Sequence, residues 1–216
     1  MNYKTFIKAA SVLALTTAAL VSATAANASP LVAPNDKGGS DSKTYQSKEC
    51  ESAWAAKAKQ MNISPAGEAC LVSVTTSVSD ARTVSASALG KAKATLSPSE
   101  FQALATAVSA GTVKSKSFRQ QSIHAASSLT QWGTFYYDGN RVWVTTPYRG
   151  FTGSHFCQVD YVVAFSIQPQ NCYDTGSNTS RTIVQQWLVT PFLDGFPLSW
   201  NESYSIDVLA DGTVRY

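Results

Sequence analysis

The side chains best suited to hydrolytic chemistry are two histidines and a group of carboxylates. His155 closes the tripeptide Gly153-Ser154-His155, and His124 lies in a polar segment. A serine nucleophile needs a histidine base and an acid beside it, and in many hydrolases the serine stands in a Gly-x-Ser-x-Gly turn that this chain lacks. We therefore interpret His155 as a surface or half-buried polar residue and His124 as solvated, and we assign no catalytic residue.

Paired carboxylates catalyse glycoside hydrolysis when two of them flank the scissile bond. The C-terminal part of the chain supplies Asp138, Asp160, Asp174, Asp194, Glu202, Asp207 and Asp211. Asp138, Asp174 and Asp211 fall in turn-like sequences, where aspartate usually bonds local backbone groups. Because the sequence brings no two of these carboxylates together, we lean toward a protein without enzymatic activity.

The four cysteines are interpreted as disulfide partners. They are Cys50, Cys70, Cys157 and Cys172. An even number of cysteines in an exported chain favours disulfide bonds. Zinc sites use Cys-x-x-Cys or Cys/His pairs at ligand spacing, which we do not find. Neither a glycine-rich phosphate loop nor a calcium loop occurs. We therefore predict no metal and no cofactor.

Four cysteines allow three connectivities, and we favour local pairing. Cys50 starts a predicted helix, and Cys70 can return to it through a loop, so a Cys50–Cys70 bridge leaves Cys157–Cys172. A straight strand over 157–167 would span about 33 Å, whereas bridged Cα atoms lie within about 7 Å. Either this strand bends in its middle, or the disulfides cross between the two halves of the chain.

The N-terminus has the pattern of a secretory signal peptide over residues 1–28. A short basic stretch precedes an apolar run over 9–21, and the small residues Ala26-Asn27-Ala28 form a cleavage site. The alternative is a retained membrane anchor, but the run is short for a span of about 20 residues. No later stretch is apolar enough to cross a bilayer. We therefore expect a secreted protein without a stable membrane span after cleavage.

The charge balance argues against nucleic acid as a partner. The chain has a net charge of +3, with only 14% charged residues. Phosphate recognition needs clustered lysine and arginine, and no basic run of that kind is present. A secreted globular protein fits this composition better.

Two helices are predicted in the N-terminal half. The first covers about 47–61, with Ser47 as its N-cap. The second begins at Ser97-Pro98-Ser99-Glu100, which has the form of a capping box with proline at the first helical position, and Gly111 ends it.

These helices set the predicted organisation of the N-terminal half. Residues 29–44 lack periodicity and are interpreted as a disordered leader. Residues 45–112 form a helical N-terminal region with one short strand at 71–78. The polar segment 113–131 is interpreted as a linker to a β domain.

The most structured stretch is a β-hairpin at 132–146, where two aromatic and β-branched runs flank Asp-Gly-Asn. Gly139 and Asn140 form the turn. One face then carries Phe135, Tyr137, Val142 and Val144. The other face pairs Tyr136 with Trp143, Thr134 with Thr145 and Asp138 with Arg141.

Further strands follow the hairpin. Residues 157–167 alternate between apolar and polar side chains, which predicts one long half-buried strand. Other strands are expected at 182–190, at 204–209 and near the C-terminus. The sequence thus predicts an α+β fold: a helical N-terminal part followed by an antiparallel β-sheet of five to six strands over 132–216, as a small sandwich or partial barrel.

The hairpin and the loop after it supply the candidate ligand-binding residues, which are Trp132, Tyr136, Arg141, Trp143 and Tyr148. Exposed flat aromatic rings stack on sugars or anchor a protein partner. The alternative is that both hairpin faces are buried in a core.

Three functional hypotheses follow from these patterns. The first is a secreted, disulfide-stabilised, non-catalytic binding module for an extracellular polysaccharide or protein. The second is a secreted hydrolase in which residues 29–131 are a removable pro-region. The third is a small exported inhibitor or toxin.

Overall fold

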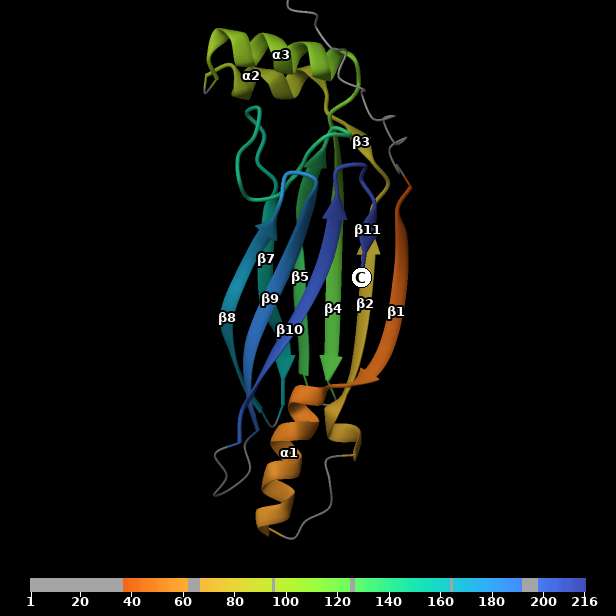
Figure 1. The fold of residues 1–216 in the computed structure, drawn as a ribbon, viewed down its shortest axis with the longest axis vertical. Helices are drawn as coiled ribbons and strands as arrows, with labels where there is room; N and C mark the ends of the chain where they lie inside the picture. The colour runs from red at the N-terminus through yellow and green to blue at the C-terminus, as the bar shows by residue number, and fades with distance from the viewer. Residues whose placement is uncertain (1–36, 62–66, 95, 125–126, 164, 192–197) are drawn as a thin grey trace, which may run out of the picture. The chain divides into compact units, whose positions relative to one another are not determined.

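Antiparallel strands make up most of the described chain and form two sheets that pack face to face (Figure 1). The computed structural model describes residues 37–61, 67–94, 96–124, 127–163, 165–191 and 198–216. Buried side chains from both sheets meet in the layer between them, where Phe118 and Phe135 of one sheet pack with Ile183 and Ile206 of the other.

The larger sheet has seven strands, and the chain before residue 132 supplies most of them. Its path runs β1-β2-β4-β5, and both β6 and β7 pair with the remaining edge of β5, while β3 pairs with the start of β4. The strands are β1 (Gly39–Gln46), β2 (Leu71–Val78), β3 (Arg82–Thr83), β4 (Lys114–His124), β5 (Ser127–Tyr137), β6 (Val142–Trp143) and β7 (Ser154–Val162).

The smaller sheet has four strands in the order β11-β10-β9-β8. They are β8 (Phe165–Gly176), β9 (Ser180–Pro191), β10 (Trp200–Leu209) and β11 (Val214–Arg215). The prediction of an α+β fold with a helical N-terminal part is wrong, because β2 and β3 come from that part of the chain and join the same sheet as the predicted hairpin.

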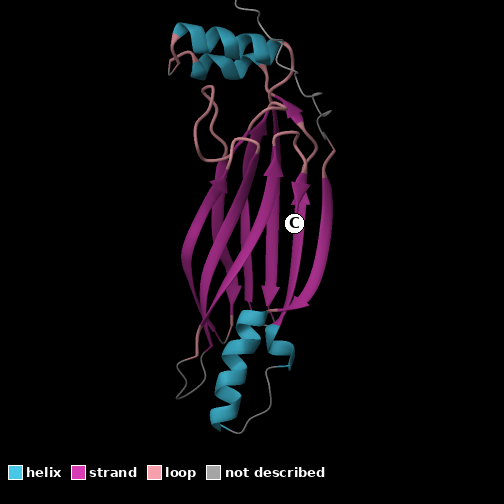
Figure 2. Cartoon of the chain, viewed as in Figure 1, coloured by secondary structure: helices cyan, strands magenta, loops and turns pink. Residues whose placement is uncertain are grey.

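Among the described residues the helices are few, and they lie at the ends of the strands (Figure 2). They are α1 (Lys48–Met61), α2 (Leu89–Ala92) and α3 (Pro98–Ser109), with short 3₁₀ turns at Gly67–Cys70 and Ala86–Ala88. The predicted capping box of α3 is confirmed, since Ser97 and Glu100 bond reciprocally across its first turn. Ser47 caps α1 as expected, because its Oγ accepts the Cys50 N–H at 3.1 Å.

The segment 113–131, which we expected to be a linker, holds β4 and the start of β5. Its inward positions include Lys116, Gln120 and Ser122, which are buried although they are polar. Both faces of β4 therefore carry mainly polar side chains, so the sequence does not alternate between apolar and polar residues and gives no strand signal there. The buried Lys116 ammonium donates to the carbonyls of Lys37 and Gly212 at 2.8 and 3.0 Å, which offsets part of its desolvation cost.

The expected disordered leader ends in a strand. Residues 29–36 lie outside the described residues, but β1 pairs with β2 along its whole length. All eight residues of β1 are exposed. Because the strand is held by backbone hydrogen bonds and buries no apolar side chain, its sequence looks like that of a solvated segment.

The hairpin register is confirmed next to the turn. Tyr136 pairs with Trp143 and Tyr137 with Val142. The four side chains predicted to share the apolar face are all in the core between the sheets: Phe135, Tyr137, Val142 and Val144. The hairpin is shorter than predicted, because Thr134 pairs with Ser154 of β7 instead of Thr145.

Disulfide bonds are present, and they join Cys50 to Cys70 and Cys157 to Cys172. The second bond needs the bend that we considered in the run 157–167. This run is two strands rather than one, because the chain leaves the larger sheet after β7 and enters the smaller sheet as β8. Cys157 and Cys172 then face each other across the two sheets, with their Cα atoms 6.0 Å apart.

Candidate ligand-binding surface

Trp143, the candidate at the centre of the hairpin, is buried. Its side chain is 3% exposed and its indole N–H donates to the Phe151 carbonyl at 3.2 Å. It packs in an apolar cluster with Leu104 and Val108 of α3. Trp143 therefore attaches α3 to the sheets and presents no face to a ligand.

Three more of the predicted residues gather around Trp143. Tyr136 stacks on its ring with centroids 5.7 Å apart, and Tyr148 meets it edge-on at 5.0 Å. The Arg141 guanidinium lies 4.0 Å from the centroid of the Tyr148 ring. These aromatic rings satisfy one another, so most of their stacking capacity is used inside the protein.

Trp132 lies apart from that cluster, on the outward face of the larger sheet. It pairs in register with Phe156 of β7, and the two ring centroids are 5.6 Å apart with an interplanar angle of 31°. Phe156 is 52% exposed. The two rings form an aromatic pair on the outward sheet face, which also exposes Ile123 and Tyr161 further along the strands.

The aromatic pair belongs to a row of side chains that crosses five strands. Cross-strand pairing places them in the order Ser40, Ser77, Arg119, Trp132 and Phe156. The neighbouring row on the same face is Ser42, Thr75, Gln121, Thr130 and Gln158. Hydroxyl and amide groups thus surround the two rings.

Asp160 supplies the negative charge beside these rows. It is the extra residue of a β-bulge in β7, opposite Ser128 and Leu129. Its carboxylate accepts hydrogen bonds from Thr130 Oγ1 at 2.6 Å and from Gln158 Nε2 at 2.8 Å, and Ser128 also donates to it. Partial burial alone would raise the pKa of Asp160, but these hydrogen bonds outweigh burial and lower it, so the carboxylate is ionised at neutral pH.

We call the set Arg119, Trp132, Phe156, Gln158 and Asp160 the outer strip. It combines two flat apolar rings with one cation, one carboxylate and one neutral amide, whereas Thr130 is buried beneath it and donates to Asp160. A sugar ring offers an apolar C–H face and a rim of hydroxyls, which such a surface can bind by stacking and by hydrogen bonds.

Sequence reasoning missed Phe156 and Asp160. The available signal was an aromatic side chain on the polar parity of β7, since Phe156 shares its parity with Gln158. The bulge at Asp160 could not be seen in the sequence. It also turns Tyr161, which shares the apolar side of the 157–167 alternation with Cys157 and Val159, to the outward face, where it is 50% exposed.

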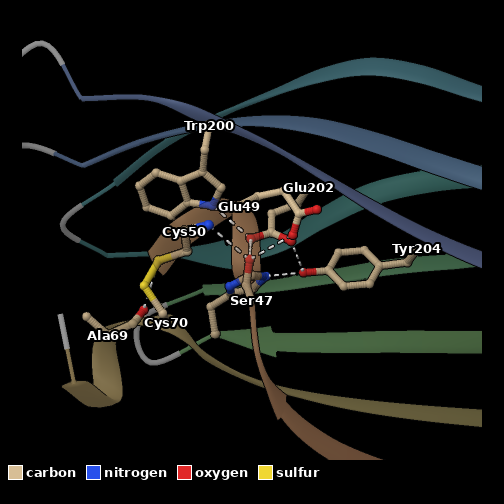
Figure 3. Close-up of a disulfide and its surroundings, with 9 residues drawn as sticks. Ser47, Glu49, Cys50, Ala69, Cys70, Trp200, Glu202 and Tyr204 are labelled. Carbon is tan, nitrogen blue, oxygen red and sulfur yellow. Dashed lines mark hydrogen bonds between the residues drawn. A yellow bond between two sulfur atoms is a disulfide. The ribbon is translucent and has the colours of Figure 1, made fainter. Parts of the chain in front are cut away.

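A second polar cluster is buried near the Cys50–Cys70 disulfide (Figure 3). The carboxylate of Glu202 accepts the Ser47 hydroxyl at 2.5 Å, the Trp200 indole N–H at 2.8 Å and the Tyr204 hydroxyl at 3.4 Å. Burial raises the pKa of Glu202, and these hydrogen bonds oppose the rise. The cluster joins the N-terminus of α1 to β10.

The prediction that His124 is solvated is wrong. His124 lies at the end of β4, is 4% exposed, and its Nε2 is hydrogen-bonded to the Tyr204 hydroxyl. Burial lowers the pKa of His124 to about 4, so the imidazole is neutral at pH 7. His124 contacts Tyr204 and not Ser47, so the cluster does not have the serine–histidine arrangement of a hydrolase.

His155 is half-buried, within the range that the sequence analysis allowed. Its Nε2 lies 2.9 Å from Gln131 Oε1, and Gln131 in turn donates to Gln120 at 2.6 Å. Gln120 donates to Thr76 Oγ1 at 3.0 Å, so four neighbouring strands are linked by one chain of side-chain hydrogen bonds that is buried from Gln131 onward. Burial lowers the pKa of His155, although the charge of Asp174 opposes this effect.

Comparisons with known proteins give no relative: no family model, curated protein or solved structure matches the chain. Within the described residues, no helix has the length and apolar character needed to cross a membrane.

Proposed function

We propose that the protein is an exported, non-catalytic binding module that recognises an extracellular polysaccharide through the outer strip. The observation that carries this proposal is the aromatic pair Trp132–Phe156 on an open, hydroxyl-rich sheet face. Export is supported by the signal-peptide pattern of residues 1–28, which lie outside the described residues, and by the two disulfides.

The chemistry of the face favours a polysaccharide over a protein partner. A stable protein interface buries about 1,200–2,000 Å² and has an apolar centre. Around the rings of the outer strip, the sheet instead carries serine, threonine and glutamine side chains. Regularly repeated hydroxyl groups match the hydrogen-bonding needs of a glycan chain, and two rings suffice to stack on its sugar units.

The hydrolase and inhibitor hypotheses gain no specific support. A hydrolase needs a nucleophile or a carboxylate pair open to substrate, whereas the carboxylate of Glu202 is buried and already accepts three hydrogen bonds.

The test is binding of the purified protein to insoluble cellulose, chitin, β-glucan and peptidoglycan by co-sedimentation. Trp132→Ala and Phe156→Ala should each weaken binding about tenfold, which is ~1.4 kcal/mol and within the range expected for one stacked aromatic contact. Tyr173→Ala is the matched control, because Tyr173 is a 39% exposed aromatic on β8 of the other sheet.

Two results would contradict the proposal. One is that the wild type binds none of the four glycans. The other is that it binds one of them and both outer-strip variants bind as well as the control.

A further inference from the structure

His155 stands beside the disulfide that joins the two sheets. Its Nε2 lies 3.4 Å from Cys157 Sγ and 3.6 Å from Cys172 Sγ. His155 and Cys157 come from β7, whereas Cys172 comes from β8. Three potential ligand atoms of two types, imidazole nitrogen and sulfur, therefore meet at one point.

We infer that reduction of the Cys157–Cys172 bond creates a zinc site formed by His155 and the two thiolates. Sulfur and imidazole nitrogen are the ligands that zinc prefers, and three protein ligands leave a fourth position for water. Cys172 is exposed, so this fourth position is open to solvent. The oxidised protein has no thiolates here and does not bind the ion.

The distances fit tetrahedral zinc. Bonds of about 2.1 Å to nitrogen and about 2.3 Å to sulfur, at the tetrahedral angle, place nitrogen and sulfur about 3.6 Å apart. The imidazole already has this separation from both sulfur atoms. Only the two sulfurs must move apart, to about 3.8 Å. Two thiols make this movement in any case when their bond is broken.

Zinc binding requires that the Cys157–Cys172 bond is first reduced to two thiols. A phosphine reductant breaks the S–S bond and becomes a phosphine oxide with an oxygen from water, and the two hydrogens of that water protonate the sulfurs. Zinc then displaces the two thiol protons into solvent and accepts the Nε2 lone pair of His155. The imidazole proton must reside on Nδ1, so the contact with Gln131 is lost on binding.

The other cysteine pair is a natural comparison. Cys50 and Cys70 are both 0% exposed. Cys50 Sγ lies 3.9 Å from the Ala69 carbonyl, which is a backbone oxygen. Zinc bound through His155 should therefore slow alkylation of Cys157 and Cys172 and leave the alkylation rates of Cys50 and Cys70 unchanged.

The experiment uses the full chain reduced with a phosphine under argon and titrated with Co²⁺ as the probe, followed by Zn²⁺. Reduced wild type should develop a thiolate-to-cobalt charge-transfer band that zinc abolishes, and the oxidised protein should not. His155→Ala should weaken Co²⁺ binding at least about tenfold, because loss of a group that only orients a metal ligand already costs about 10–100-fold. His124→Gln, which changes the other histidine, should bind as the wild type does.

Thiol alkylation with mass mapping gives a second readout on the wild type. Zinc should protect Cys157 and Cys172 from alkylation. The inference is overturned by absence of the band in reduced wild type, by equal affinity of His155→Ala, or by protection of Cys50 and Cys70 instead. If near-ultraviolet circular dichroism shows that His155→Ala is unfolded, His155→Gln, which retains an amide near Gln131, takes its place.

Discussion

The buried His124 should make the protein sensitive to acid. At pH 7 its imidazole is neutral in the folded protein, and burial holds its pKa at about 4. In the unfolded chain the pKa returns to about 6.5. Between these two values the unfolded chain binds a proton that the folded protein does not, so acid favours unfolding.

The size of this effect follows from the pKa difference. A pKa lowered from 6.5 to about 4 gives stability that is fully present above pH 6.5 and is lost as the pH falls through 4. At 1.36 kcal/mol per pKa unit, His124 costs the folded state about 3 kcal/mol when the pH is lowered from 7 to 4. This is a large part of the free energy of unfolding of a typical domain, which is about 5–15 kcal/mol.

The assay is urea unfolding of wild type and His124→Gln at pH 7, 5.5 and 4. Glutamine cannot be protonated but keeps a polar group near the Tyr204 hydroxyl. Glu202 acts in the opposite direction, because its raised pKa makes protonation easier in the folded protein, and His155 acts in the same direction as His124. Glu202 and His155 are present in both proteins. The difference in unfolding free energy between wild type and His124→Gln therefore reports the contribution of His124.

We expect the stability advantage of wild type over His124→Gln to shrink by about 3 kcal/mol between pH 7 and pH 4. If the difference between the two proteins is the same at all three pH values, the imidazole is not buried in the neutral form and the reasoning fails.

Two further predictions concern local structure. Ser97→Ala removes the capping box of α3 and should lower the free energy of unfolding by about 1 kcal/mol. Ser99→Ala, two residues further along, is its control, and equal losses would contradict the capping role. Gly133→Ala should destabilise the protein far more, because a Cβ there would lie 1.9 Å from the Ser154 carbonyl oxygen and would force β5 and β7 apart. Gly90→Ala has open space and should be nearly neutral in the same thermal unfolding assay, so similar losses at both glycines would contradict the steric explanation.

The features that sequence reasoning found depend on neighbouring residues. The capping box at Ser97 and the hairpin around Gly139 are each coded within a few positions, so periodicity and turn chemistry suffice to locate them. The prediction of the apolar face of the hairpin was also correct, because Phe135 and Tyr137, two residues apart, lie on the same face of the strand and are both buried.

The errors arise where distant partners decide the structure. β1 is a strand only because the edge of β2 is available for pairing, and β4 buries Lys116 and Gln120 against groups far away in the sequence. The same holds for the outer strip, since Trp132 and Phe156 meet only when β5 and β7 pair. Local composition carries no information about these contacts.

The disulfide between β7 and β8 has a mechanical consequence. This disulfide holds the two sheets together at the side formed by β7 and β8. The sheets should therefore separate first at the opposite side, where β1 and β11 lie (Figure 1). A cavity of about 290 Å³, lined in part by Tyr45, Tyr204 and Arg215, already opens between the sheets on that side. Solvent should therefore reach the interior first through this cavity. The amide protons of β11 should exchange with solvent long before those of β7.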